Sequence, residues 1–141
     1  MDTLNSLFTN IAPFFILLGL LIFVHELGHF LVAKYFGVRV ETFSLGFGKK
    51  ILSHKRGDTT YCISLIPLGG YVKMFGDDPT AKGDVPSADR QYAFLHKPVM
   101  QRVAIVLAGP IMNLIFAVVL FTMINGIGET LPGPVLGDVQ E

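Results

Sequence analysis

The sequence contains no tryptophan, a single cysteine, and no lysine or arginine outside the stretch from Lys34 to Arg102. The one cysteine, Cys62, excludes an internal disulfide, so no disulfide framework holds the chain together. A lone thiol of this kind is more often a small buried hydrophobe than a nucleophile. The formal net charge is zero, which gives no reason to expect nucleic acid as a partner.

No positive charge precedes the first long apolar run, and no small-residue cleavage site follows it. A secretory signal peptide would have both features, so we expect this run to stay in the mature protein. Hydrophobic residues make up 51% of the chain. Two runs, residues 11–33 and residues 98–125, are long and apolar enough to span a bilayer. The sequence therefore predicts two transmembrane helices.

The first predicted span contains His25-Glu26-Leu27-Gly28-His29, which has the pattern H-E-x-x-H. Residues four apart share one face of a helix, so both imidazoles can reach one metal ion. Glu26 can then act as general base on a water molecule at that metal. A chance match, or histidines reaching the headgroups from a helix end, are the alternatives. Ionisable side chains inside a bilayer cost about 2.5 kcal/mol or more each, which favours the metal site.

The distribution of positive charge predicts the topology. All eleven lysine and arginine residues lie from Lys34 to Arg102, after the first span and no later than the first turns of the second. The positive-inside rule places this loop, residues 34–102, in the cytoplasm and both termini in the periplasm. Residues 1–10 then form a short periplasmic lead. The metal site lies nearer the cytoplasmic face.

The part of the loop that follows the first span, residues 34–75, predicts a small β-structure. Residues 55–58 are typical of a hairpin turn between two strand-like runs, and residues 67–70 of a second turn. The region is unusually apolar for a cytoplasmic segment. Two interpretations stay open. The hairpins can dip toward the metal site, lining a cavity, or form an ordinary sheet at the interface. An edge at residues 42–47 could pair with an extended substrate.

The remaining segments are less regular. Residues 76–97 predict a cytoplasmic loop that ends in a short amphipathic helix around residues 90–95. Residues 126–141 predict a periplasmic tail that begins an extended stretch without a partner strand. We therefore expect a further domain to follow.

The second span carries one functional candidate and no metal ligand. Gly109-Pro110 should kink or loosen its helix. Asn113 either forms a hydrogen bond to another helix or donates to a substrate backbone or a developing oxyanion. A catalytic zinc normally has three protein ligands, and the sequence so far offers only two candidates, His25 and His29. The loop histidines, His54 and His96, are poor candidates for the third.

Four ordered motifs resemble the site-2 protease family of intramembrane metalloproteases. They are His25-Glu26-Leu27-Gly28-His29-Phe30, Phe43-Ser44-Leu45-Gly46-Phe47-Gly48, Ile66-Pro67-Leu68-Gly69-Gly70-Tyr71-Val72-Lys73 and Ala108-Gly109-Pro110-Ile111-Met112-Asn113. The resemblance implies Zn²⁺, cleavage of peptide bonds within membrane-spanning segments, and a membrane-dipping β-sheet. It further implies a multi-pass protein of the bacterial inner membrane that acts in regulated intramembrane proteolysis. Single-pass substrates, among them an anti-sigma factor and remnant signal peptides, are implied in the same way.

The resemblance also implies parts that these residues lack. Periplasmic PDZ domains would follow the second span, and a later span would carry an Asp beyond residue 141 as third zinc ligand. The chain is thus expected to be the N-terminal part of the enzyme, inactive alone, with the bilayer and the C-terminal remainder as partners.

The predicted fold is an α-helical polytopic membrane protein with two transmembrane helices and a re-entrant β-hairpin sheet between them. The predicted zinc ligands are His25 and His29, with Glu26 catalytic. The predicted substrate-binding residues are Thr42, Phe43, Ser44, Leu45, Gly46, Phe47 and Asn113. A metal-conducting or metal-sensing membrane protein and a non-catalytic, partner-binding fragment remain as alternatives.

Overall fold

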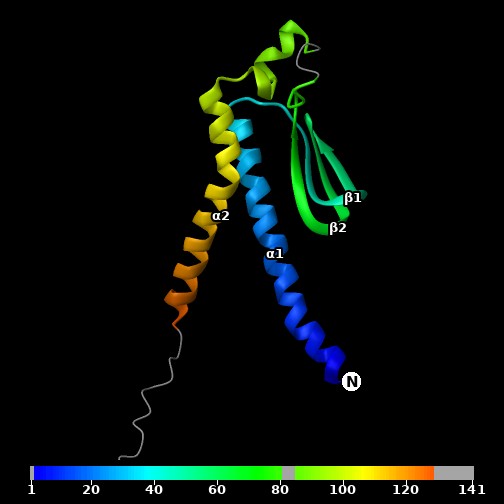
Figure 1. Cartoon of the computed structure of the whole chain (residues 1–141), viewed down its shortest axis with the longest axis vertical. Helices are drawn as coiled ribbons and strands as arrows, with labels where there is room; N and C mark the ends of the chain where they lie inside the picture. Colours follow the sequence, from blue (N-terminus) through cyan, green and yellow to red (C-terminus); the bar gives the residue numbers. More distant parts are fainter. Residues whose placement is uncertain (1, 81–84, 129–141) are drawn as a thin grey trace, which may run out of the picture.

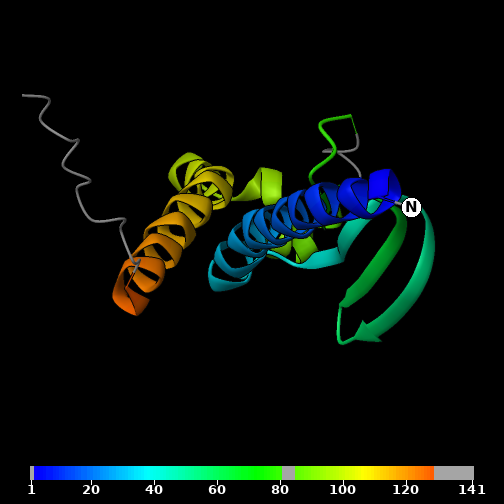
Figure 2. The ribbon, with the colours of Figure 1, turned by 90° about the horizontal axis from the view of Figure 1, so that it is seen from below.

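The computed structural model describes residues 2–80 and 85–128. In order, its elements are α1 (Asp2–Tyr35), β1 (Val40–Arg56), β2 (Thr59–Met74), the 3-10 helices η2 (Ser87–Tyr92) and η3 (Phe94–His96), and α2 (Val99–Ile127). The helix α1 lies between α2 and the sheet formed by β1 and β2 (Figure 1, Figure 2). Two long helices with a small sheet between them in the chain were predicted, and this order of elements is confirmed. Most of the predicted tail, residues 126–141, lies outside the described residues.

Both long helices are apolar and little covered by the rest of the chain. Residues Ile11–Tyr35 and Val99–Ile127 are each long and apolar enough to cross a membrane. Only 11% and 17% of their most apolar windows are buried inside the protein. The core helix of a soluble protein would be mostly buried, so this exposure argues against that interpretation.

The helix boundaries differ from the predicted ones in two places. The helix α1 begins at Asp2, so residues 2–10 are helical and continuous with the predicted span. That stretch contains no glycine or proline, and an existing helix extends readily through such residues. The helix α2 continues through Pro110, so the expected kink or loosening at Gly109-Pro110 does not end the helix. At the end of the loop, the expected short helix is a pair of 3-10 helices.

The strands β1 and β2 pair antiparallel in one sheet. Their connection is the two-residue turn Gly57-Asp58, inside the predicted turn at residues 55–58. Gly57 adopts a φ of 61°, a left-handed conformation that glycine takes without steric cost. Pairs such as Arg56 with Thr59 and His54 with Tyr61 extend the hairpin from this turn. The predicted hairpin is therefore confirmed.

Both strands bend, and the first half of β1 ends up inside the sheet. Residues 42–45 are paired with residues 70–73 on one side and with residues 60–63 on the other. The bend in β1 follows at Gly46 and Gly48, whose φ values are 85° and 84°. The outer segments of the folded sheet are residues 70–74 of β2 and residues 50–56 of β1.

The second predicted turn, at residues 67–70, lies within β2 at a place where the chain reverses direction. Before it, residues 60–63 pair with residues 42–45 in the same direction, from Thr42 with Thr60 to Leu45 with Ile63. After it, residues 70–73 pair with the same residues in the opposite direction, from Leu45 with Gly70 to Thr42 with Lys73. Gly69 lies in this reversal and has a φ of 138°. The predicted turn is therefore confirmed, although the strand assignment of β2 runs through it.

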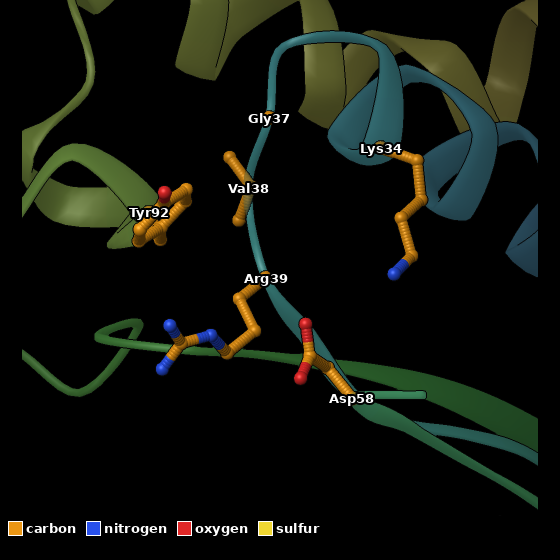
Figure 3. Close-up of a pocket in the computed structure, with 6 residues that line it drawn as sticks. All are labelled: Lys34, Gly37, Val38, Arg39, Asp58 and Tyr92. Atoms are coloured by element: carbon orange, nitrogen blue, oxygen red, sulfur yellow. The ribbon is translucent and has the colours of Figure 1, made fainter. Parts of the chain in front are cut away.

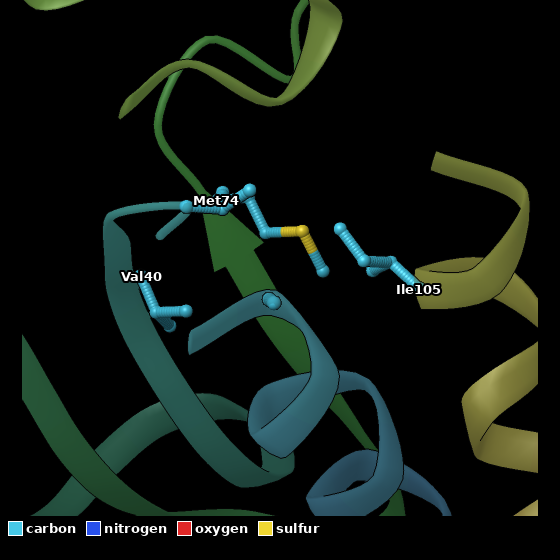
Figure 4. Close-up of a cluster of buried hydrophobic side chains, with 5 residues drawn as sticks. Val40, Met74 and Ile105 are labelled. Atoms are coloured by element: carbon cyan, nitrogen blue, oxygen red, sulfur yellow. The ribbon is translucent and has the colours of Figure 1, made fainter. Parts of the chain in front are cut away.

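The buried core lies where the ends of the four main elements meet. It comprises Ala33, Val38, Val40, Met74 and Ile105, all at most 8% exposed. Figure 4 shows Met74 of β2 reaching toward Ile105 of α2 beside Val40 of β1. This junction fixes the start of α2 against the end of α1. It therefore sets the height at which the two helices face each other.

Replacing Ile105 with alanine should lower the free energy of unfolding by about 2–5 kcal/mol, because the removed atoms leave a cavity in this core. The side chain of Ile105 is fully buried. Ile115 lies on the same helix and is 51% exposed, so Ile115→Ala is the matched control and should change little. Equilibrium unfolding of both variants in mixed detergent micelles measures the difference. Equal losses in both variants would contradict the placement of this core.

A polar junction lies beyond the C-terminal end of α1. Arg39 stacks between the rings of Phe75 and Tyr92, at 5.0 Å and 5.1 Å, and its Nη2 lies 3.2 Å from Asp89 Oδ1. A cavity of about 330 Å³ adjoins it, into which Lys34 also points (Figure 3). Charged side chains are therefore gathered at this end of the molecule, beyond the two apolar helices.

Candidate active site

Two imidazoles from α1 meet beside α2. His25 and His29 lie about one turn apart on α1, and their Nε2 atoms are 3.2 Å apart. Two zinc–nitrogen bonds of about 2.0–2.1 Å at a tetrahedral angle would hold their nitrogen atoms about 3.3–3.4 Å apart. The two predicted ligands are therefore brought together, and their separation fits a shared tetrahedral metal ion.

The main chain of α2 orients the ring of His29. Its Nδ1 lies 2.7 Å from the carbonyl oxygen of Ile105. A carbonyl oxygen only accepts, so Nδ1 carries the proton and donates it. The neutral ring then keeps a lone pair on Nε2, the atom that faces His25. This tautomer is the one that binds a metal through Nε2.

The ring of His25 also contacts α2 through its Nδ1. The side-chain nitrogen of Asn113 lies 3.3 Å from this atom. The hydrogen bond crosses from one helix to the other, which is the structural role considered for this asparagine. Asn113 therefore lies next to the histidine pair, at a position where it can influence His25.

Two glycines allow the helices to approach closely at the site. A Cβ atom built on Gly109 would collide with Nε2 of His29 and lie 2.8 Å from Nε2 of His25. A Cβ atom on Gly28 would collide with the carbonyl oxygen of Ala108 and lie 2.9 Å from Cβ of Met112. Gly109 thus leaves open the space in front of both metal-binding nitrogens, and Gly28 permits the helix contact.

Glu26 faces the sheet side of α1 rather than α2. It lines a cavity of about 310 Å³ together with His29, residues 70–72 of β2 and Ile105 of α2. A Cβ atom on Gly70 would lie 2.9 Å from Cγ of Glu26, so the strand passes directly against this carboxylate. A carboxylate next to a histidine pair and open to a cavity can accept a proton from a water molecule held there.

The sequence model described as Peptidase family M50 matches residues 13–136, which include both histidines, Glu26 and Asn113. The chain belongs to peptidase family M50. The resemblance to the site-2 proteases is therefore confirmed.

Named relatives of this M50 chain are proteases. Protease RseP of Yersinia pestis is 48% identical over 136 residues, which are 96% of this chain and 30% of that protein. Regulator of sigma-E protease RseP of Escherichia coli K12 is 48% identical over 136 residues, which are 95% and 29% of the two chains. A protein of Clostridium acetobutylicum with zinc metalloprotease in its name is 46% identical, over 94% of this chain and 37% of its own length. The chain thus spans about three tenths of the curated RseP relatives, and the family and the names indicate a metalloprotease.

The third ligand of the M50 site is not found in the described part of the chain. Residues 2–80 and 85–128 contain no group of three or more His, Cys, Asp or Glu side chains that could hold a metal. His54 lies on β1 opposite Tyr61, and His96 ends η3. Neither joins the histidine pair. The aspartate expected beyond residue 141 stays a prediction.

The predicted substrate-binding segment of the M50 chain lies inside the sheet, not at its edge. Thr42, Phe43, Ser44 and Leu45 have paired neighbours on both sides. Their main chain therefore cannot add another strand, which corrects the expected mode of pairing. Strand addition needs an edge, and the edge nearest Glu26 is residues 70–74 of β2.

The side chains of the same segment serve mostly to pack the sheet. Phe43 makes edge-to-face contacts with Phe23 and Phe30 of α1, at 6.2 Å and 5.3 Å between ring centroids. Ser44 is fully buried, and its Oγ lies 3.2 Å from Oγ of Ser64. Gly46 is buried too, whereas Phe47 is 44% exposed. A contact of these side chains with substrate stays a prediction.

Three residues of the M50 site were missed in the sequence. Gly70 was assigned only to a turn, and Gly109 was interpreted together with Pro110 as the cause of a kink. No sequence pattern points to the main-chain carbonyl of Ile105. A spacing could have pointed to two of them. Ile105, Gly109 and Asn113 recur every four residues and share one face of α2, the face that meets His29 and His25.

Proposed function

We propose that this chain forms the histidine-bearing part of a membrane-embedded zinc metalloprotease that hydrolyses peptide bonds in membrane-spanning segments. The observation that carries the proposal is the pair of Nε2 atoms 3.2 Å apart, beside Glu26, within a helix long enough to cross a bilayer. Polar groups at such depth are costly unless they serve a site. The names of relatives that contain zinc metalloprotease support the choice of metal.

Each site residue has one role in the proposed reaction. His25 and His29 hold zinc through neutral imidazole nitrogens. Zinc, when bound, polarises the scissile carbonyl and makes water more acidic. Glu26 accepts a proton from the water whose oxygen bonds to the carbonyl carbon. It then donates that proton to the amide nitrogen as the carbon–nitrogen bond breaks.

The sheet is proposed to enter the membrane alongside α1. Its contacts with α1 involve Ile22, Phe23, Glu26 and Phe30, which lie within the predicted span. Large apolar side chains at its bend are exposed, namely Phe47 44%, Ile51 59%, Leu52 62%, Ile63 48%, Leu65 62%, Ile66 47% and Leu68 56%. Exposed lysines, Lys49 and Lys50, occur at the same bend and need water. A sheet that lines a water-containing cavity within the membrane satisfies both.

The proposed substrates are single-pass membrane proteins. A helical substrate hides its carbonyl groups in hydrogen bonds and has to unwind before it can be hydrolysed. An unwound segment can pair with the edge of β2 at residues 70–74, because residues in that stretch line the cavity that also contains Glu26. The relatives named regulator of sigma-E protease support an anti-sigma factor as one such substrate.

The proposed setting is the bacterial inner membrane, with residues 34–102 in the cytoplasm and the two termini in the periplasm. The confinement of every lysine and arginine to that loop supports this orientation. Because the chain spans about three tenths of its RseP relatives, the remaining ligand is proposed to come from the rest of the protein.

Cleavage of a single-span membrane protein by the complete protein in liposomes tests the proposal. We expect a zinc chelator to stop cleavage and added zinc to restore it. The variant His29→Ala should be inactive, while His54→Ala, on the exposed part of β1, should cleave normally. Cleavage that persists without zinc would overturn the proposal. Zinc flux across the liposome without cleavage would instead favour the metal-handling alternative.

A further inference from the structure

The two histidines of the site are supported by one face of α2. Along this face, Ile105 reaches His29, Gly109 faces both rings, and Asn113 reaches His25. The three positions of α2 are four residues apart, and the histidines of α1 are four apart in the opposite direction. Each ring therefore has its own neighbour on α2, with an open space between the two neighbours.

The two neighbours do not impose the same tautomer on their rings. The carbonyl oxygen of Ile105 can only accept, so it fixes the proton of His29 on Nδ1. The side-chain amide of Asn113 has an oxygen that accepts and a nitrogen that donates. If its nitrogen faces Nδ1 of His25, the proton of a neutral ring has to sit on Nε2, where it blocks metal binding.

The metal-binding nitrogen of His25 decides between the two orientations of the amide. Nδ1 of His25 faces Asn113, so a metal shared with His29 has to bind this ring through Nε2, the atom that faces His29. A neutral ring that binds through Nε2 carries its proton on Nδ1, and of the two amide groups only the oxygen can accept it. Rotating the amide by half a turn exchanges two groups of nearly equal shape. The rotation moves the amide nitrogen to the buried position of the oxygen, so burial alone does not choose between the orientations.

We infer that Asn113 is a positioning residue that accepts a hydrogen bond from Nδ1 of His25 and so keeps Nε2 available for the metal. The inference deepens the proposed function and rests on it. It assigns to Asn113 the role that the Ile105 carbonyl has for His29, in place of substrate binding. Partners of this kind fix the ring and strengthen the ligand, and losing one typically weakens metal affinity about 10–100-fold.

Two substitutions of similar size separate an acceptor from a donor at this position. Asn113→Asp keeps an oxygen that can accept from Nδ1, and Asn113→Leu removes it. In the complete protein, zinc affinity is measured by competition with a chromophoric chelator. We expect the leucine variant to bind zinc about 10–100-fold more weakly and the aspartate variant to stay close to the unchanged protein. Asn125→Leu is the matched control, because Asn125 lies on the same helix and donates to Phe121 at 2.8 Å.

A second readout does not depend on activity. The ¹⁵N chemical shifts of histidine in the zinc-loaded protein report which ring nitrogen carries the proton and which binds the metal. We expect His25 to bind through Nε2 with Nδ1 protonated in the unchanged protein and in the aspartate variant. In the leucine variant the Nδ1 proton of His25 loses its acceptor, so the signals of this Nδ1–H group should shift, while those of His29 should stay fixed by Ile105.

The outcomes separate this inference from the proposed function. Unchanged zinc affinity in Asn113→Leu together with lost cleavage would show that Asn113 acts on the substrate, and the inference would be overturned. Equal weakening in the aspartate and leucine variants would overturn it as well. Failure of the unchanged protein to bind zinc would instead overturn the proposed function.

Discussion

Glu26→Gln should abolish cleavage by the complete protein and leave its zinc content unchanged. Glutamine keeps the shape of the side chain but cannot take a proton from water, and general base catalysis contributes about 10²–10⁴-fold to such reactions. The imidazoles do not depend on Glu26 for their hydrogen bonds, since His29 donates to Ile105 and His25 contacts Asn113. Initial rates in liposomes and zinc per chain, measured on the same samples, test both parts.

Glu41→Gln is the matched control for this substitution. Glu41 Oε2 lies 2.9 Å from Nζ of Lys73 in the sheet, and the pair is partly exposed. The hydrogen bond and the negative charge of Glu41 raise the pKa of Lys73, so the substitution should lower that pKa again. Cleavage should stay near normal. A near-normal rate in Glu26→Gln would remove Glu26 from the mechanism.

Gly109→Ala should abolish zinc binding and reduce cleavage by on the order of 10²-fold or more, because displacements of about 1 Å at a reacting centre have effects of this size. The added Cβ atom would collide with Nε2 of His29 and crowd Nε2 of His25. Either α2 moves away, which breaks the hydrogen bond that His29 donates to the carbonyl oxygen of Ile105, or both rings turn. Zinc per chain and cleavage rate are the measurements.

Gly126→Ala is the control for the change in backbone entropy. Gly126 is also in α2, and a Cβ atom there would meet nothing within 4 Å. Both substitutions favour helix formation by a similar amount. Gly126→Ala should therefore bind zinc and cleave normally. Normal zinc content in Gly109→Ala would contradict the close approach of α2 to the histidines.

The parts of the fold that follow from local pattern could be predicted from the sequence. His25 and His29 lie four residues apart on a helix and so share one face, with Glu26 beside them. The turn at Gly57 follows from the left-handed conformation that glycine adopts without steric cost. The two spans follow from length and apolarity. The confinement of the lysines and arginines to the loop can be seen in the sequence without knowing the fold. None of these features depends on contacts between distant residues.

The parts of the fold that depend on pairing between distant residues could not be predicted from the sequence. Residues 42–45 were expected at an edge, but β2 pairs with them on both sides, and nothing local in the sequence encodes that second partner. Residues 67–70 have the composition of a turn and the chain does reverse there, but no local feature shows that residues 70–73 then pair with residues 42–45. Gly109 has a role because of His25 and His29 on another helix. Its neighbour Pro110 drew attention to a kink instead.

X-ray absorption at the zinc edge, on the complete protein in detergent, tests most directly whether His25 and His29 hold one zinc ion. We predict one zinc per chain with two imidazole ligands at about 2.0–2.1 Å and oxygen in the remaining positions. In His25→Ala the imidazole signal should fall to one ligand or zinc should be lost. Zinc bound by sulfur, or a two-imidazole signal that survives in His25→Ala, would contradict the assignment.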